Sequence, residues 1–191
     1  AIAILRGSFE FQGQKCSAAS RVYVPESIWE DVKTTLVEEI PKMKMGDTRD
    51  FSNFMGAVID QSAFEKHKEF LQCAHDTATV LAGGKAHGET GWFIEPTLVQ
   101  VSDPKHRLME EEIFGPIVTI YVYKDENWSS ILQTLDETSP YALTGAVFSQ
   151  NRYAIQEALS ALQNCAGNFY INDKPTGAVV GQQPFGGARG S

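Results

Sequence analysis

The feature that most constrains the fold is the run at residues 117–123, which is almost continuously apolar and rich in β-branched side chains. Such a run is typical of a central parallel strand that is buried on both faces. After it, the sequence indicates a helix near 127–138, a strand at 145–148, a helix near 152–163 and a strand at 168–171. This alternation predicts an α/β fold with a mainly parallel sheet and helices on both faces.

The earlier part of the chain contains the same kinds of element. The whole chain of 191 residues has the length of one domain. Strands are expected around 22–24 and 79–82, and an extended segment at 92–101 is interrupted by Pro96. Ser27 with Glu30, and Ser62 with Glu65, have the spacing of capping boxes. Each pair therefore predicts the beginning of a helix.

Composition and charge exclude several function classes. The formal net charge of −8 argues against nucleic acid or an anionic membrane as the main partner, and no apolar run is long enough to span a membrane. Three scattered cysteines fit a reducing compartment, and the four histidines lack ligand-like spacing, so no metal site is predicted. His67, on the apolar stripe of a helix, is expected to be a hydrogen-bonded packing residue.

Cys16 stands among small residues immediately before a predicted strand. Gly13 permits a sharp turn there, and the small neighbours leave space around the sulfur. Backbone N–H groups or nearby cations favour the nucleophilic thiolate, and Lys15 and Arg21 are candidate cations. From the residues alone, the alternative is a small hydrophobic side chain packed in the core.

Four motifs, in order, resemble those of the aldehyde dehydrogenase family. They are Gly13-Gln14-Lys15-Cys16-Ser17-Ala18 with Arg21, Glu112-Ile113-Phe114-Gly115-Pro116, Asn168-Phe169-Tyr170-Ile171-Asn172 and Pro184-Phe185-Gly186-Gly187. Within the family, residues 176–187 are most similar to the L-glutamate γ-semialdehyde dehydrogenases, also called Δ1-pyrroline-5-carboxylate dehydrogenases. The resemblance spans almost the whole chain. It implies that residues 1–191 form the family's cysteine-bearing catalytic domain.

The resemblance also implies roles for single residues in the oxidation of a small-molecule aldehyde with NAD. Cys16 would add to the aldehyde and carry a thioester that water hydrolyses. Glu112 would bind the nicotinamide ribose hydroxyls, and Phe114 would pack beside the nicotinamide ring. These expectations predict an oxidoreductase of proline metabolism.

A substrate-anchoring role is implied for the tail, residues 173–191. Gly177 and Ala178 would bind the α-carboxylate of glutamate γ-semialdehyde through backbone N–H groups. Ala178 stands where some members have serine, so only a backbone contact is expected there. Ser17 would add a hydroxyl donor, and Phe185 would pack on the aliphatic part of the substrate. From the residues alone, a plain surface loop remains the alternative.

Several parts of the family pattern do not occur in these 191 residues. They are the general-base glutamate, the oxyanion asparagine and the cofactor domain before the cysteine, and the oligomerisation flap after it. The abrupt apolar start at Ala1 likewise predicts a piece of a longer chain. We therefore expect the isolated segment to be inactive. The full-length enzyme is expected to be a homo-oligomer, in the mitochondrial matrix if eukaryotic and in the cytoplasm if bacterial.

Three other interpretations remain open at this point. One is another aldehyde dehydrogenase, and the second is a non-catalytic module that binds partners through a sheet edge and the tail. An independent cysteine acyl hydrolase would need a histidine near Cys16, and no histidine has neighbours that suggest this role. The reactivity of the Cys16 thiol separates the catalytic interpretations from the module.

Overall fold

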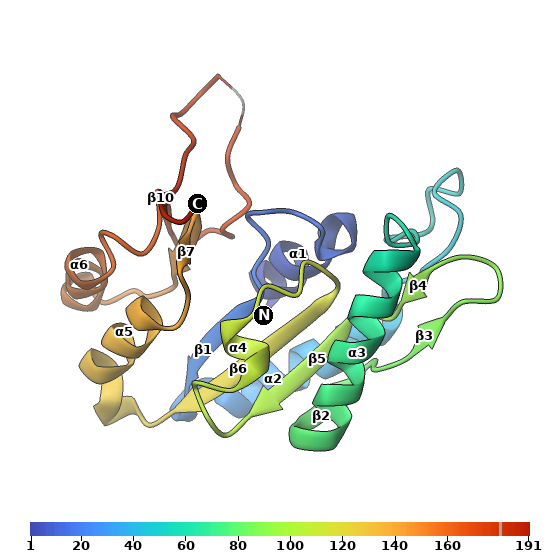
Figure 1. Ribbon diagram of the computed structural model, residues 1–191. Helices are drawn as coiled ribbons and strands as arrows, with labels where there is room; N and C mark the ends of the chain where they lie inside the picture. Colours follow the sequence, from blue (N-terminus) through green and yellow to red (C-terminus); the bar gives the residue numbers. More distant parts are fainter. Residues whose placement is uncertain (180) are drawn as a thin grey trace.

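The computed structural model describes residues 1–179 and 181–191, so Val180 of the tail motif lies outside the described residues. Its main element is a four-stranded sheet in the order β1-β6-β5-β2 (Figure 1). The strands are β1 (Arg21–Pro25), β2 (Thr79–Ala82), β5 (Thr97–Val101) and β6 (Ile117–Tyr123). Strand β6 pairs in parallel with β1 and β5, whereas β2 is antiparallel to β5. The predicted central strand and mainly parallel sheet are confirmed.

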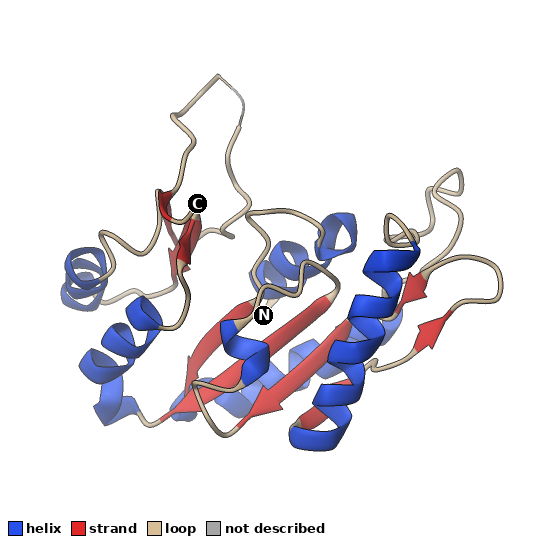
Figure 2. Ribbon diagram, viewed as in Figure 1, coloured by secondary structure: helices blue, strands red, loops and turns tan. Residues whose placement is uncertain are grey.

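Helices cover both faces of this sheet (Figure 2). One face packs against α1 (Ile2–Phe9) and α2 (Glu26–Glu39), the other against α3 (Gln61–Thr77) and α4 (Arg107–Glu110). Alternate residues of a strand point to opposite faces. Leu98 of β5 accordingly joins the α1–α2 core, while Val99 and Val101 join the α3–α4 core. Two apolar cores therefore hold the sheet.

A second group of elements lies beside the main sheet. It contains α5 (Trp128–Glu137), α6 (Arg152–Ala161) and the parallel pair β8 (Thr144–Val147) and β9 (Asn168–Ile171). Strand β7 (Tyr141–Ala142) pairs with β10 (Ala188–Arg189), which returns the end of the chain to this group. The predicted order of strands and helices is confirmed, although β8 and β9 form their own small sheet.

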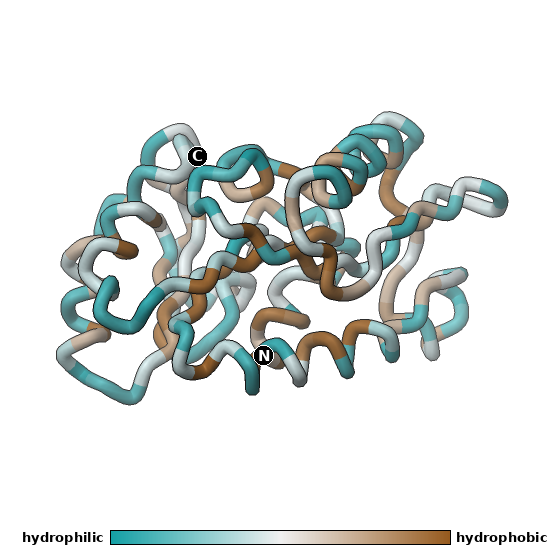
Figure 3. Tube along the Cα trace, turned by 90° about the horizontal axis from the view of Figure 1, so that it is seen from below, coloured by the Kyte–Doolittle hydropathy of each residue, from teal (hydrophilic) through white to brown (hydrophobic). Residues whose placement is uncertain are grey.

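Short elements complete the chain. A two-stranded hairpin consists of β3 (Ala86–His87) and β4 (Phe93–Ile94). Single 3₁₀ turns occupy Ile40–Lys42 and Asp125–Asn127, and a turn that contains left-handed residues occupies Glu10–Gly13. The most hydrophilic segments lie at the periphery in Figure 3. In the part of the chain that the structure describes, no helix has the length and apolar character needed to cross a membrane.

Both predicted capping boxes are wrong. Helix α2 begins at Glu26 after Pro25, and Ser27 hydrogen-bonds to the Asp125 carboxylate instead of capping the helix. Helix α3 begins at Gln61, where the Asp60 carboxylate accepts from the Ala63 amide at 2.8 Å. A carboxylate is a good N-cap because it also interacts favourably with the helix dipole.

Candidate active site

Two loops meet at one edge of the main sheet because the strands that follow them are parallel neighbours. The cysteine loop, residues 10–20, leads into β1, and the Glu112 loop, residues 111–116, leads into β6 (Figure 1). Arg21 lies opposite Thr119 in the pairing, and the Thr119 amide donates to the Ser20 carbonyl at 3.0 Å. This is the amino end of both strands. The common preference of α/β sites for carboxyl ends does not apply to this pair of loops.

The cysteine loop begins with three consecutive residues in the left-handed region. Phe11, Gln12 and Gly13 have φ values of 60°, 59° and 64°. This conformation is costly for residues with a Cβ and persists where the surroundings impose it. The Gln12 side chain supplies part of that constraint, because it donates to the Ala57 carbonyl at 3.1 Å and accepts from the Gly56 amide at 3.2 Å.

Cys16 is the second residue of a tight turn, closed by a 3.0 Å hydrogen bond from the Ala18 amide to the Lys15 carbonyl. Its side chain is exposed, so the alternative of a core cysteine is wrong. Within residues 1–179 and 181–191, the N–H groups of Cys16 and Ser17 donate to no protein acceptor. The turn therefore presents a thiol together with two backbone donors.

The Glu112 loop directs its second and fourth residues, Glu112 and Phe114, outward. Ile113 is buried, whereas Glu112 and Phe114 are exposed on either side of it. Helix α3 holds the backbone between them. Lys66 donates to the Glu112 carbonyl at 2.9 Å, and His67 Nε2 lies 3.0 Å from the Phe114 carbonyl oxygen. The carboxylate and the ring are consequently presented on a fixed backbone.

His67 is the packing histidine that the sequence predicts. It is 1% exposed, and burial lowers the pKa of its imidazole. Since a carbonyl can only accept, Nε2 must carry the proton in the bond to Phe114. A Cβ on Gly115 would lie 2.3 Å from that nitrogen, so the ring leaves space only for glycine.

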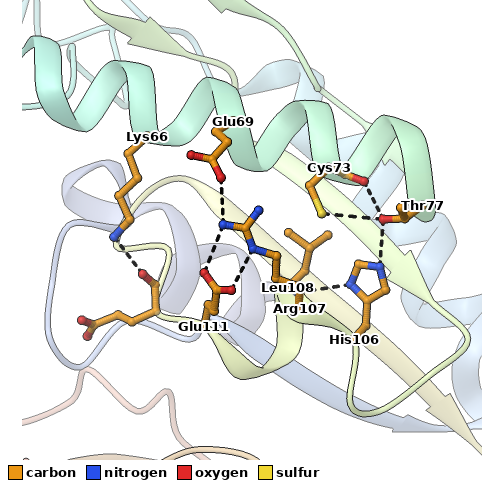
Figure 4. A network of polar contacts seen from close by, with 9 residues as sticks. Lys66, Glu69, Cys73, Thr77, His106, Arg107, Leu108 and Glu111 are labelled. Atoms are coloured by element: carbon orange, nitrogen blue, oxygen red, sulfur yellow. Dashed lines mark hydrogen bonds and ion pairs between the residues drawn. The ribbon is translucent and has the colours of Figure 1, made fainter.

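An exposed ion-pair network links the helices on this side of the sheet (Figure 4). Arg107 of α4 binds Glu69 of α3 at 2.8 Å and Glu111 at 2.8 Å. Figure 4 also shows Lys66 of α3 reaching the backbone of the Glu112 loop. The loop is thus held from both α3 and α4.

Glu10 connects the end of α1 and the cysteine loop to the tail, which is distant in sequence. Its carboxylate pairs with Arg6 of α1, with Lys15 of the cysteine loop at 3.3 Å and with Lys174 of the tail at 2.8 Å. Partial burial would raise the pKa of Glu10. The bonds from Lys174, Arg6 and Lys15 outweigh it and lower the pKa to about 2. Lys15 is therefore engaged by a carboxylate, which the sequence analysis did not foresee.

The tail begins beside the cysteine loop (Figure 1). A Cβ on Gly7 would contact both Ala19 and Pro175 at 3.5 Å, so the tail crosses α1 next to that loop. Gly177 follows closely, and a Cβ there would lie 2.9 Å from the Asp173 carboxylate. Ala178, the next residue, is half-buried. The structure thus places the start of the tail close to the cysteine loop.

The outer limb of the tail, residues 184–186, is held by strand β9. Asn168 of β9 donates to the Pro184 carbonyl at 2.8 Å and accepts from the Gly186 amide at 3.1 Å. Phe185 lies between these two contacts and is 51% exposed. Ser17 is linked to the second group of elements, because its carbonyl accepts from the Thr144 hydroxyl at 3.4 Å.

An open pocket of about 260 Å³ lies between the cysteine loop and the first turns of α3, and Gln14 and Phe114 both line it. No group of three His, Cys, Asp or Glu residues in the described ranges 1–179 and 181–191 is arranged to hold a metal ion. The four histidines bond to other groups: His67 to the Phe114 carbonyl, His75 to the Gly84 carbonyl, His87 to Glu95 and His106 to Thr77. These contacts give no support to the acyl hydrolase interpretation.

The chain belongs to the aldehyde dehydrogenase family, whose model matches residues 1–191. It is 55% identical over 189 residues to the mitochondrial Δ1-pyrroline-5-carboxylate dehydrogenase of Dictyostelium discoideum. The aligned region covers 98% of this chain and 34% of that protein. The human mitochondrial enzyme of the same name is 52% identical over 190 residues, again with 98% and 34% covered. The chain therefore spans about a third of the length of these relatives.

A solved structure shows the same fold. The Δ-pyrroline-5-carboxylate dehydrogenase from Mycobacterium tuberculosis, with NAD and cobalamin bound, superposes with a TM-score of 0.93 and 46% sequence identity. The match covers 100% of this chain and 35% of that one. The expected family fold is confirmed.

Proposed function

We propose that this chain is the cysteine-bearing catalytic part of an NAD-dependent L-glutamate γ-semialdehyde dehydrogenase, with Cys16 as the nucleophile. The observation that carries the proposal is the exposed Cys16 turn, which shares a sheet edge with the outward-facing Glu112 and Phe114. The relatives' names supply the reaction class. The full-length enzyme is, in this proposal, the protein that contains residues 1–191 and the remaining two thirds of the relatives' length.

The chemistry of Cys16 is covalent. Its thiolate forms an S–C bond to the aldehyde carbon, and the carbonyl π electrons move to oxygen as an oxyanion. The N–H groups of Cys16 and Ser17 suit this charge because they carry no protein acceptor in the described residues. After oxidation, water attacks the thioester carbonyl, the C–S bond breaks, and the carboxylate product and the Cys16 thiolate are released while the two protons of the water pass to solvent.

The residues present fit the nicotinamide end of NAD. Glu112 offers an exposed carboxylate that can accept from two ribose hydroxyls, and Phe114 offers an apolar ring that is 40% exposed. When bound, NAD would supply the acceptor for the hydride that leaves the substrate carbon. Lys66 and His67 hold the backbone between the two side chains, so the binding groups are fixed before the cofactor arrives.

The start of the tail suits the other end of the substrate. Gly177 and Ala178 lie just after the point where the tail passes the cysteine loop, and their N–H groups are assigned to the substrate α-carboxylate. Ser17 is assigned a supporting hydroxyl contact. Phe185, on the exposed outer limb, is assigned to the aliphatic part of the substrate, which requires that limb to lie over the site when substrate binds.

The remaining two thirds would supply what these residues do not contain. The general base for thioester hydrolysis, the oxyanion asparagine and the cofactor domain belong to it, so residues 1–191 alone turn over no NAD. The full-length enzyme is a homo-oligomer in this proposal. The names of the relatives support a mitochondrial location; within it the proposal places the enzyme in the matrix, with the cytoplasm as the alternative.

The proposal is tested by NADH production in the full-length enzyme given NAD and L-glutamate γ-semialdehyde. We expect steady turnover, and we expect Glu112→Gln to raise the KM for NAD while the KM for the aldehyde stays within about twofold. Residues 1–191 alone should give no steady NADH. If the full-length enzyme oxidises another aldehyde but not the semialdehyde, the assignment of glutamate γ-semialdehyde as the substrate is wrong.

A further inference from the structure

We propose that Glu10 is a positioning residue that sets where the substrate-anchoring start of the tail stands relative to Cys16. The inference rests on the proposed function and deepens it, because it assigns substrate selectivity to a residue that touches neither substrate nor cofactor. The substrates for which this positioning matters are aldehydes that carry a carboxylate at the far end of the molecule.

The geometry of Glu10 carries the argument. One carboxylate oxygen, Oε2, accepts from Lys15 at 3.3 Å and from Lys174 at 2.8 Å, and the other accepts from Arg6. Lys15 immediately precedes Cys16, and Lys174 stands three residues before Gly177. A single atom therefore joins the segment that bears the nucleophile to the segment that bears the carboxylate anchor.

The contact is more than a surface ion pair. The side chains of Glu10, Lys174 and Lys15 are 17%, 27% and 30% exposed, whereas exposed pairs contribute little to stability. Side-chain packing supports it, because a Cβ on Gly7 of α1 would lie 3.5 Å from the side chains of both Pro175 and Ala19. The start of the tail is thus held by one ionic contact and one packing contact, both against elements that flank the cysteine turn.

The local charge also suits an anionic substrate. Arg6, Lys15 and Lys174 contribute three positive charges, and Glu10 and Asp173, whose carboxylate lies beside Gly177, contribute two negative charges, so the group carries +1 in a chain of formal net charge −8. Such a local excess attracts a carboxylate to this edge of the protein. Loss of Glu10 would increase the positive charge and release Lys174. The two effects are separated by the sign of the change in Glu10→Gln, because added positive charge would lower the KM for an anionic substrate, whereas release of Lys174 would raise it.

The experiment measures KM and kcat in the full-length enzyme for two aldehydes. One is L-glutamate γ-semialdehyde, and the other is a neutral aldehyde of similar length, hexanal. For Glu10→Gln and for Lys174→Met, we expect the KM for the semialdehyde to rise about tenfold or more. The kcat and the KM for hexanal should change by less than about threefold, because the reacting groups are intact.

A double-mutant cycle tests whether the two residues act through each other. The Glu10→Gln/Lys174→Met enzyme should show about the same KM as either single variant, since both remove one contact. Lys174→Arg should restore most of the wild-type KM, because arginine can make the same pair. Glu30→Gln is the matched control: Glu30 also pairs with a lysine, Lys33, but on the exposed side of α2, and it should leave both KM values unchanged.

Two outcomes would overturn the inference. One is a semialdehyde KM that is unchanged in Glu10→Gln and Lys174→Met, and the other is an equal change in KM for both aldehydes, which would indicate a purely structural role. Failure of the proposed function looks different, because wild-type enzyme would then show no preference for the semialdehyde. If Glu10→Gln does not fold, Lys174→Met and its rescue by arginine decide the question alone.

Discussion

A Cβ placed on Gly13 would lie 2.4 Å from the carbonyl oxygen of Gly115. The cysteine loop and the Glu112 loop therefore meet backbone to backbone at these two glycines. Each glycine also has a second reason to be there: Gly13 has φ of 64°, and Gly115 faces the His67 ring. This contact fixes the cysteine loop against the loop that bears the proposed cofactor-binding residues.

Gly13→Ala should destabilise the protein and impair catalysis. A left-handed residue with a Cβ costs about 1–2 kcal/mol, and the clash with a backbone atom adds to it, so we expect at least about 2 kcal/mol in urea unfolding. Gly186→Ala is the matched control, because Gly186 has open space and no positive φ, and its effect should stay below about 0.5 kcal/mol. Equal stability of the two variants would contradict the tight loop contact.

Glu10 predicts a specific loss of stability in acid. Its pKa falls from an ordinary value of 4.5 to about 2 in the folded protein, so the folded state binds this proton less readily than the unfolded state. The stabilisation is complete above pH 4.5 and is lost as the pH falls towards 2. Glu10→Gln should flatten this part of the stability profile, measured by urea unfolding from pH 5 to 2. An unchanged profile would show that the Glu10 contacts contribute nothing.

His67 predicts a second pH dependence and a link to the cofactor. Burial lowers the pKa of His67 below its ordinary value of 6.5, so its contribution is present above pH 6.5 and is lost as the pH falls below it. His67→Leu removes the donor to the Phe114 carbonyl and should cost about 1–3 kcal/mol. It should also raise the KM for NAD.

His67→Gln serves as the matched variant. Glutamine can place an N–H near the same carbonyl, so it should retain most of the NAD affinity and lose the pH dependence below 6.5. If the glutamine and leucine variants raise the KM for NAD equally, the hydrogen bond to Phe114 does not orient the loop.

The three cysteines should react with iodoacetamide in order of exposure. Cys16 is exposed, Cys73 is partly exposed, and Cys165 is buried, where burial raises the pKa of its thiol. Peptide mapping of the native enzyme over time should find Cys16 labelled first and Cys165 last. Labelling of Cys165 before Cys16 would contradict the described position of the cysteine turn.

The strands and helices could be predicted from sequence because they depend on local patterns. The apolar run of β6 and the apolar stripe that includes His67 each indicate burial by the spacing of apolar residues close together in the sequence. Helices do begin beside Ser27 and Ser62, but their capping residues were mispredicted, because Ser27 bonds to Asp125, which is 98 positions away, and Asp60 precedes the expected cap of α3. A local rule cannot detect such competing partners.

The candidate site likewise has residues that the sequence could predict and residues that it could not. Cys16, Glu112 and Phe114 belong to short motifs, and the structure shows all three exposed at or near one sheet edge. Glu10 was missed because its partner Lys174 lies 164 positions further on, and only the folded chain brings them together. The proximity of the two loops likewise follows from parallel pairing of β1 and β6, which no motif records.

The most direct test of the central claim is the NADH burst in a single turnover of the full-length enzyme with L-glutamate γ-semialdehyde. Cys16→Ser should lower its rate by about 10³-fold or more, because the hydroxyl is a much weaker nucleophile than the thiolate. Cys73→Ser, which alters a cysteine on the far turn of α3, should leave the burst unchanged. A normal burst from the Cys16→Ser enzyme would contradict the assignment of Cys16 as the nucleophile.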